Sequence, residues 1–215
     1  MTSPATAGRP FDAVLCDLDN VIRFYDTTRL TELEHAAGLT PGTTTDVAYA
    51  PETDLPLLLG RITQQEWIES IVRALPDELP EPRARALATA LAEAPFRADD
   101  AVVCLLRHVR AHLPVVLVTN ATLELERDLA SLGLTDLADH VVSSARVGVA
   151  KPDREIYDIA AARAGVAPER CLFVDDRLEN VEAARAMGMT GVHYREPSDL
   201  RTALSFLPRI QAGSA

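Results

Sequence analysis

Short apolar segments that alternate with helical segments constrain the fold of this chain more than any other feature. Five of them have the composition of buried strands: Phe11–Cys16, Val115–Val118, His140–Val142, Cys171–Val174 and Thr190–His193. From the second strand onward, the helical segments between them have the length of crossover connections, and each ends at a glycine, the residue that suits a helix C-terminus. This alternation predicts an α/β fold: a three-layer Rossmann-like core with a mostly parallel sheet.

Between residues 21 and 97 the alternation stops. Helical patterns occupy Thr28–Ala37, Thr63–Ala74 and Arg83–Ala94, and we find no convincing strand pattern in this segment. Thr63 followed by Glu66 is the signature of a capping box at a helix N-terminus. We therefore expect a small all-helical cap inserted after the first strand. The expected division is a core of residues 11–20 and 98–210, a cap of residues 21–97, and flexible termini of residues 1–10 and 211–215.

Composition narrows the possible partners and the cellular location. The formal net charge of -11 argues against nucleic acid or an anionic membrane surface as a partner. No apolar run approaches the roughly 20 residues that span a membrane, and residues 1–10 lack the apolar stretch of a secretory signal. We interpret Cys16, Cys104 and Cys171 as buried thiols in a reducing compartment. We expect a cytoplasmic protein, and the sequence leaves its oligomeric state open.

Polar residues follow four of the predicted strands. In chain order they are Asp17 and Asp19, Thr119 and Asn120, Lys151, and Asp175 and Asp176. Taken one at a time, each group could be a helix cap or a solvated charge. Because parallel strands end at one edge of a sheet, where open α/β sheets bind ligands, we expect these side chains to meet in one crevice.

Such a set of groups is what phosphoryl transfer through an enzyme carboxylate requires. One carboxylate attacks phosphorus, a second acid protonates the leaving group, and a hydroxyl, an amide and a lysine hold the phosphoryl oxygens. A hard cation must neutralise the remaining charge, and Mg²⁺ suits this role because it takes oxygen ligands from carboxylates and phosphates. The sequence therefore predicts a small-molecule phosphate ester as substrate and Mg²⁺ as cofactor.

The order Asp-x-Asp, Thr-Asn, Lys-Pro and Asp-Asp resembles that of the haloacid dehalogenase superfamily. The segments at residues 147–153 (Val-Gly-Val-Ala-Lys-Pro-Asp) and 173–184 also look like that family, and the similarity runs from about Phe11 to His193. The predicted helical insertion is similar to the cap of the branch that includes β-phosphoglucomutase, small sugar-phosphate phosphatases and the phosphatase domain of soluble epoxide hydrolase.

The resemblance implies a role for each motif residue. Asp17 would be the nucleophile that forms an aspartyl-phosphate, and Asp19 would protonate the leaving oxygen and then activate water. Thr119 would bind a phosphoryl oxygen through its hydroxyl group, and Asn120 through its backbone. Lys151 would counter the charge of the nucleophile and of the phosphate.

The resemblance also implies the metal ligands. They would be Asp17, Asp19 through its backbone carbonyl, Asp176 and Asp175. Asn180 stands where the family pattern has a second aspartate. Which of Asp175, Asp176 and Asn180 would bind the metal directly, and which would only support its ligands, stays open.

Asp19 favours phosphate ester chemistry, because a departing halide needs no proton and dehalogenases of the family generally lack this second aspartate. We predict Mg²⁺-dependent hydrolysis of a small phosphorylated metabolite such as a sugar phosphate. A phosphomutase of the β-phosphoglucomutase type, a haloacid dehalogenase-like hydrolase and a phosphate-binding regulatory protein stay open as alternatives. Arg23, Arg61 and Trp67 could contact the substrate or could serve only the packing of the cap and its hinge.

Overall fold

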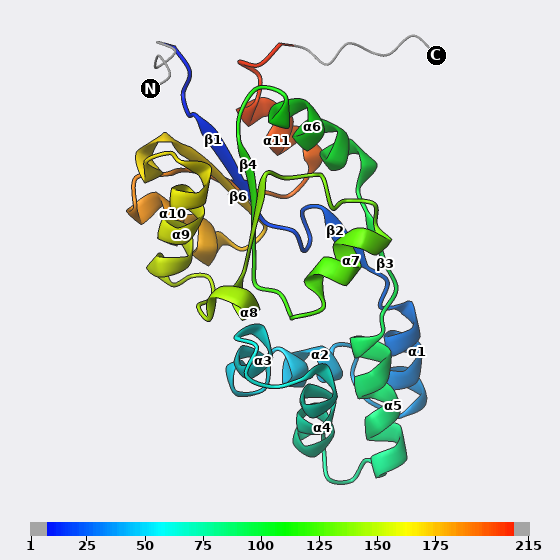
Figure 1. Cartoon of the computed structure of the whole chain (residues 1–215). Helices are drawn as coiled ribbons and strands as arrows, with labels where there is room; N and C mark the ends of the chain where they lie inside the picture. Colours follow the sequence, from blue (N-terminus) through cyan, green and yellow to red (C-terminus); the bar gives the residue numbers. More distant parts are fainter. Residues whose placement is uncertain (1–7, 209–215) are drawn as a thin grey trace, which may run out of the picture.

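The computed structural model describes residues 8–208, so residues 1–7 and 211–215 of the predicted flexible termini lie outside the described part. A five-stranded sheet with the order β5-β4-β1-β6-β7 forms the centre of the larger part of the molecule (Figure 1). Its strands are β1 (Ala13–Cys16), β4 (Val115–Thr119), β5 (His140–Ser143), β6 (Cys171–Asp175) and β7 (Thr190–His193). Every neighbouring pair is parallel, which confirms the predicted fold class.

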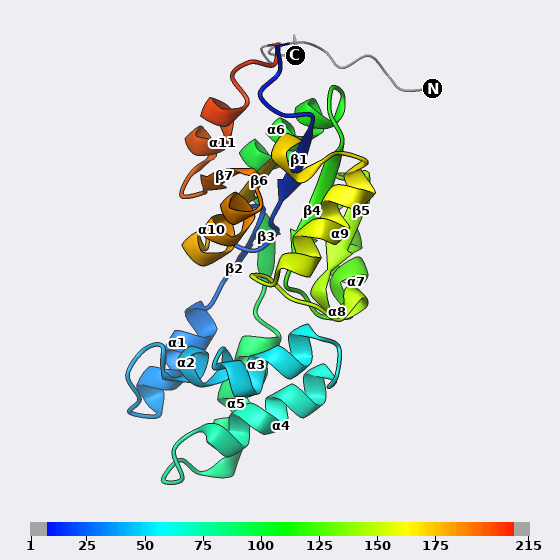
Figure 2. The ribbon, with the colours of Figure 1, turned by 90° about the vertical axis from the view of Figure 1, so that its left-hand side faces the viewer.

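Helices cover both faces of this sheet (Figure 2). They are α6 (Asp100–Arg110), α7 (Leu125–Ser131), α8 (Ser144–Val147), α9 (Arg154–Ala164), α10 (Leu178–Ala186) and α11 (Pro197–Ala203), with a 3₁₀ turn at Pro168–Arg170. Val14 and Cys16 of β1 pack into the hydrophobic cluster under α6, α7 and α11. Ala13 and Leu15 pack into the cluster under α9 and α10. Because successive strand side chains point to opposite faces, a strand that is apolar throughout needs both helical layers.

A separate group of helices lies below the sheet, between β1 and β4 in the sequence (Figures 1 and 2). These helices are α1 (Thr28–Ala36), α2 (Thr43–Ala48), α3 (Pro51–Leu58), α4 (Gln64–Ala74) and α5 (Glu81–Ala92). They enclose a hydrophobic cluster of their own around Trp67, Ile71 and Leu87. The capping box of Thr63 and Glu66 is present at the start of α4. The exact division into core and cap residues stays a prediction.

The expectation of no strand between residues 21 and 97 is wrong. β2 (Arg23–Tyr25) and β3 (Phe96–Ala98) form an antiparallel two-stranded ribbon in which Arg23 pairs with Ala98. Each strand has three residues, too few to show an alternating pattern in the sequence. The ribbon matters for the site, because it carries the chain out to the helices and back.

The cysteines agree only in part with the expectation that all three are buried. Cys16 and Cys171 are buried, whereas Cys104 is exposed. Cys104 lies in an apolar run, but α6 turns Val102, Leu105 and Leu106 towards the sheet and Cys104 away from it. No helix within residues 8–208 is both long and apolar enough to cross a membrane.

Candidate active site

The end of β1 separates the two aspartates of the first motif. β1 stops at Cys16, and the chain then turns so that the backbone N–H groups of Ile22 and Arg23 both donate to the carbonyl oxygen of Leu18, at 2.8 Å each. Asn20 sits in this turn with φ 59°, a left-handed conformation that asparagine tolerates better than most residues. Asp17 and Asp19 therefore do not lie side by side along one strand, in agreement with the different roles predicted for them.

Lys151 lies between two carboxylates at the sheet edge. Its Nζ is 2.7 Å from Oδ1 of Asp17 and 2.7 Å from Oδ2 of Asp175. Asn120 fixes the Lys151 backbone from both sides: its Nδ2 donates to the Lys151 carbonyl oxygen at 2.9 Å, and its Oδ1 accepts from the Lys151 N–H at 2.8 Å. The Asn120 side chain is thus used to hold the lysine, which leaves its backbone for the phosphate contact predicted above.

Burial and opposite charges compete in the electrostatics of this cluster. Burial raises the pKa of Asp17 to about 8, against the lowering effect of the Lys151 charge and with a further rise from Asp175. Burial opposes the charge of Lys151, but the two carboxylates outweigh it and raise its pKa. Because a carboxylate attacks only when ionised, a further cation beside Asp17 would favour its reactive form.

The second acidic pair lies at the end of β6. Asp175 is fully buried and accepts hydrogen bonds from Nδ2 of Asn180, at 3.0 and 3.1 Å, and from the Arg177 N–H at 2.8 Å. Asp176 is less buried and accepts from Nδ2 of Asn20 at 3.1 Å. Burial, together with the charge of Asp175, raises the pKa of Asp176. The side-chain amide of Asn180 therefore orients Asp175.

Three carboxylates from two strand ends could hold a metal ion. One oxygen each of Asp17, Asp175 and Asp176 lies within 4.8 Å of the others. A donor set made only of carboxylate oxygens fits Mg²⁺, which prefers hard oxygen ligands. The carboxylate of Asp19 is not part of this group; its predicted contribution through the backbone carbonyl stays a prediction.

Thr119, the last residue of β4, has an unsatisfied side chain. Its hydroxyl group is buried and has no hydrogen-bond partner among the described residues. A buried hydroxyl without a partner costs about 1–3 kcal/mol. A binding site can carry this cost if the ligand supplies the missing hydrogen-bond partner. The predicted partner of the Thr119 hydroxyl group is a phosphoryl oxygen.

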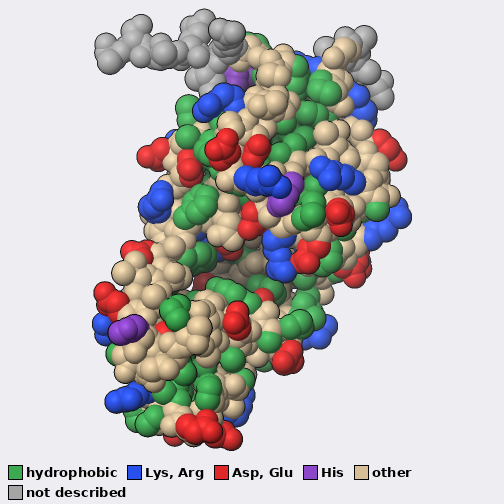
Figure 3. Space-filling model, turned by 180° about the vertical axis from the view of Figure 1, so that it is seen from behind, with side chains coloured by type: hydrophobic (Ala, Val, Ile, Leu, Met, Phe, Trp, Pro, Cys, Tyr) green, Lys and Arg blue, Asp and Glu red, His purple; other side chains and the backbone are tan. Residues whose placement is uncertain are grey.

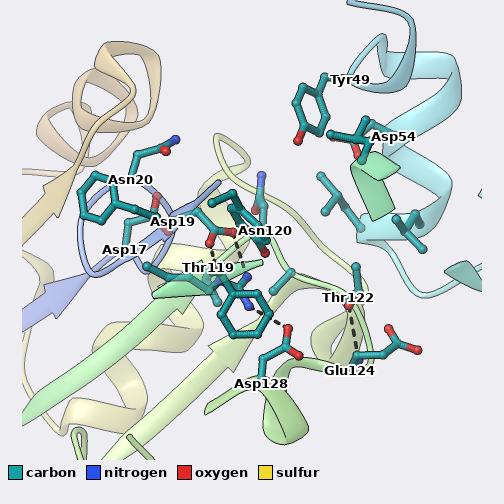
Figure 4. Close-up of a pocket in the computed structure, with 18 of the residues that line it drawn as sticks. Asp17, Asp19, Asn20, Tyr49, Asp54, Thr119, Asn120, Thr122, Glu124 and Asp128 are labelled. Atoms are coloured by element: carbon teal, nitrogen blue, oxygen red, sulfur yellow. Dashed lines mark hydrogen bonds and ion pairs between the residues drawn. The ribbon is translucent and has the colours of Figure 1, made fainter. Parts of the chain in front are cut away.

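A cavity of about 900 Å³ joins this sheet edge to the helices α2 to α5. The space-filling view shows the surface hollowed where the helical part meets the sheet part (Figure 3). Tyr49 and Asp54 lie on the helical side, across the cavity from Asp17, Asp19 and Asn20 (Figure 4).

Of Arg23, Arg61 and Trp67, whose contact with the substrate the sequence left open, two line this cavity. Trp67 does so while it also packs in the hydrophobic cluster of the helices, and its Nε1 donates to the Ala48 carbonyl oxygen at 3.4 Å. Arg23 lines it and binds Asp19. Arg61 is exposed and is not part of the described cavity wall.

The structure adds functional candidates that the sequence did not single out. Both oxygens of Asp19 accept hydrogen bonds from Arg23, and Asp128 of α7 binds the same guanidinium group. Asp54 faces the cavity from α3, and burial raises its pKa to about 6 against the opposing charge of Arg177. No local sequence pattern marks Asp54 or Asp128, because each is recognised as part of the site only through contacts with residues far away in the chain.

Comparison with known proteins places this geometry in context. The family model of haloacid dehalogenase-like hydrolases matches residues 11–188. Phosphatase MT3486 of Mycobacterium tuberculosis is 32% identical over 192 residues, which cover 82% of this chain and 84% of that protein. Sesquiterpene phosphatase astK of Aspergillus oryzae is 35% identical over 103 residues, which cover 47% of this chain and only 53% of that protein.

A solved structure shares the fold. The HAD family enzyme bt-2542 of Bacteroides thetaiotaomicron, in complex with magnesium and inorganic phosphate, superposes with a TM-score of 0.63 at 20% identity. The match covers 84% of this chain and 92% of that one.

Proposed function

Because this chain belongs to the haloacid dehalogenase-like hydrolases, we propose that it is a phosphatase that hydrolyses small phosphate monoesters through an aspartyl-phosphate on Asp17. The observation that carries the proposal is the arrangement at the sheet edge: a buried carboxylate beside a buried lysine and an unsatisfied hydroxyl group, all facing one cavity. The two relatives described above are both phosphatases, which supports the same reaction class.

In the proposed reaction Asp17 attacks phosphorus while Lys151 balances its charge, and the hydroxyl group of Thr119 with the backbone of Asn120 receives the phosphoryl oxygens. Asp19 protonates the departing alkoxide and then removes a proton from the water that cleaves the aspartyl-phosphate. Lys151 is already in contact with Asp17 before any ligand binds, so little reorganisation is needed when charge moves to the phosphoryl group.

We propose Mg²⁺ as the cofactor, held by Asp17, Asp175 and Asp176. When bound there, it would neutralise negative charge on the nucleophile and on the phosphoryl oxygens. The donor chemistry of this carboxylate group supports the assignment.

The cavity wall supports a substrate whose leaving group carries no second anion. The wall residues supplied by α1 to α5 and the loops between them are Thr27, Thr45, Tyr49, Asp54, Leu57, Leu58, Gln64, Trp67 and Leu91. None of these described residues is basic, and the single charge among them is the carboxylate of Asp54. The basic residues on the rest of the wall are Arg23, Arg127, Lys151 and Arg177. Arg23 and Lys151 are paired with Asp19 and Asp17, Arg177 is paired with Glu179 at 2.6 Å, and Arg127 is exposed to solvent. We propose an uncharged, partly apolar alcohol or sugar as the leaving group.

The test of the function is hydrolysis of 4-nitrophenyl phosphate with Mg²⁺ and with a chelator, by the parent and by Asp17→Asn. We expect turnover only by the parent with Mg²⁺. Equal turnover by both proteins would reject Asp17 as the nucleophile. For the substrate class, we expect geranyl phosphate and glucose 6-phosphate to exceed fructose 1,6-bisphosphate in kcat/KM, and the reverse order would contradict the proposal.

A further inference from the structure

The carboxylate of Asp19 is held by a bidentate ion pair. Nε of Arg23 donates to Oδ1 of Asp19 at 2.6 Å, and a terminal nitrogen donates to Oδ2 at 3.0 Å. Paired, planar contacts of this kind fix the direction of a carboxylate as well as its position. Both oxygens of the proposed proton donor are therefore directed by one side chain.

Arg23 is itself fixed from several sides. Its other terminal nitrogen donates to Oδ2 of Asp128 at 2.7 Å, and its side chain is only 4% exposed. The guanidinium carbon lies 5.0 Å from the ring centroid of Tyr25 and 5.3 Å from that of Phe96, within the range of cation–π attraction. The backbone of Arg23 pairs with Ala98 in the β2–β3 ribbon. The guanidinium group thus has a fixed place that does not depend on Asp19 alone.

This geometry has a consequence for proton transfer. Asp19 must present an oxygen to the leaving group, so at least one of its two contacts with Arg23 has to open during the reaction. Asp128 keeps the guanidinium group in place when that happens, because it binds a different nitrogen. The Asp19 side chain lines the cavity and is 31% exposed, which leaves room for this movement.

We propose that Arg23 is a positioning residue for proton transfer: its bidentate pair directs the Asp19 carboxylate towards the leaving-group side of the cavity, and Asp128 anchors Arg23. The inference rests on the proposed phosphatase function. The competing interpretation is that Arg23 is only a structural brace of the ribbon.

Leaving groups of different acidity separate these two interpretations. Benzyl phosphate releases a basic alkoxide and needs a proton, whereas 4-nitrophenyl phosphate releases an acidic phenol and hardly needs one. General acid catalysis contributes about 10²–10⁴-fold. If Arg23 positions Asp19, Arg23→Gln lowers kcat/KM for benzyl phosphate at least about tenfold more than for 4-nitrophenyl phosphate, as part of that contribution.

The experiment compares the parent, Arg23→Gln, Asp19→Asn and the double variant on both substrates. Because both substitutions would disable one proton transfer, we expect the double variant to lose little more on benzyl phosphate than Asp19→Asn alone. Asp128→Asn should shift the ratio between substrates in the same direction by a smaller factor. Arg146→Gln is the matched control: it breaks an exposed pair between α8 and Glu126 of α7, the helix that also carries Asp128, and it should leave the ratio unchanged.

Equal loss on both substrates, or independent losses that add in the double variant, would overturn the positioning role. If Arg23→Gln does not fold, the ratio between the two substrates is measured in Arg23→Lys and Asp128→Asn instead, and a ratio unchanged from the parent in both would also overturn the positioning role. Failure of the proposed function would look different, because Asp17→Asn would then leave 4-nitrophenyl phosphate hydrolysis intact.

Discussion

Replacement of Lys151 by methionine is a direct test of the electrostatics at the sheet edge. Lys151 is the only lysine in the sequence, and its Nζ lies 2.7 Å from an oxygen of Asp17 and of Asp175, all three side chains being nearly inaccessible to solvent. Methionine keeps most of the length and removes the charge. Loss of one partner of a buried ion pair costs about 3–5 kcal/mol, a large part of the ~5–15 kcal/mol that stabilises a typical protein.

For a chain of this size that loss lowers the melting temperature by roughly 6–20 °C, at about 2–4 °C per kcal/mol. The assay is thermal and urea unfolding with a chelator present. Lys151→Met/Asp175→Asn should be more stable than Lys151→Met, because the second substitution removes one of the two uncompensated carboxylates. Arg154→Met, which breaks an exposed pair with Asp158, is the control and should cost less than about 1 kcal/mol.

The reasoning would be refuted if Lys151→Met lost no more stability than the control, or if the double variant were the less stable of the two. The pH dependence gives a further check. The Lys151 charge lowers the pKa of Asp17 against burial, so its loss raises that pKa further. A group with a raised pKa in the folded state stabilises the protein at low pH, and this stabilisation is lost as the pH rises. The difference in free energy of unfolding between variant and parent should therefore become smaller towards acid pH.

Further substitutions probe two cavity residues, Asp54 and Thr119, and one glycine with a left-handed backbone, Gly60. Burial gives Asp54 a folded-state pKa of about 6 against an ordinary 3.8, so its stabilising proton is lost as the pH rises through this range. Between pH 3.8 and about 6 the free energy of unfolding of Asp54→Asn, measured with urea, should therefore rise by at most about 3 kcal/mol relative to the parent, and a difference that does not change with pH would contradict this. Thr119→Val removes an unsatisfied hydroxyl group; we expect unchanged or higher stability but at least about tenfold weaker inhibition by vanadate, and unchanged inhibition would count against the phosphate contact. At Gly60, with φ +65°, an added Cβ would lie 2.8 Å from the Ala145 carbonyl oxygen, so Gly60→Ala should lower the melting temperature, whereas Gly133→Ala, with open space around it, reports the cost of the backbone strain alone.

The centre of the sheet could be predicted because β1, β4 and β6 are buried along their whole length and consist largely of apolar residues, a pattern that is visible without distant information. The convergence of Asp17, Lys151 and Asp175 followed from one rule about strand ends in parallel sheets. Thr119 and Asp175 proved to be the last residues of β4 and β6 rather than residues beyond them, since both still pair in the ladder.

The rest of the site depends on contacts that no local sequence pattern predicts. Arg23 and Asp128 are 105 residues apart in the chain, and the strand that places Arg23 is too short to leave a periodic signal. Asp54 lies in α3, which contains Pro56 and falls outside the helical segments that the sequence predicts. These residues face the cavity only because the helical insertion folds back over the sheet edge, and such packing is set by the whole molecule.

The central claim is that Asp17 becomes phosphorylated during turnover. Borohydride reduces an aspartyl-phosphate, so the residue that carried the phosphate becomes homoserine. We would quench Asp19→Asn during turnover of 4-nitrophenyl phosphate with Mg²⁺, because loss of the proposed base slows hydrolysis of the intermediate, and map the peptides by mass spectrometry. The account predicts homoserine at position 17; homoserine at another aspartate, or at none while 4-nitrophenol is released, would contradict it.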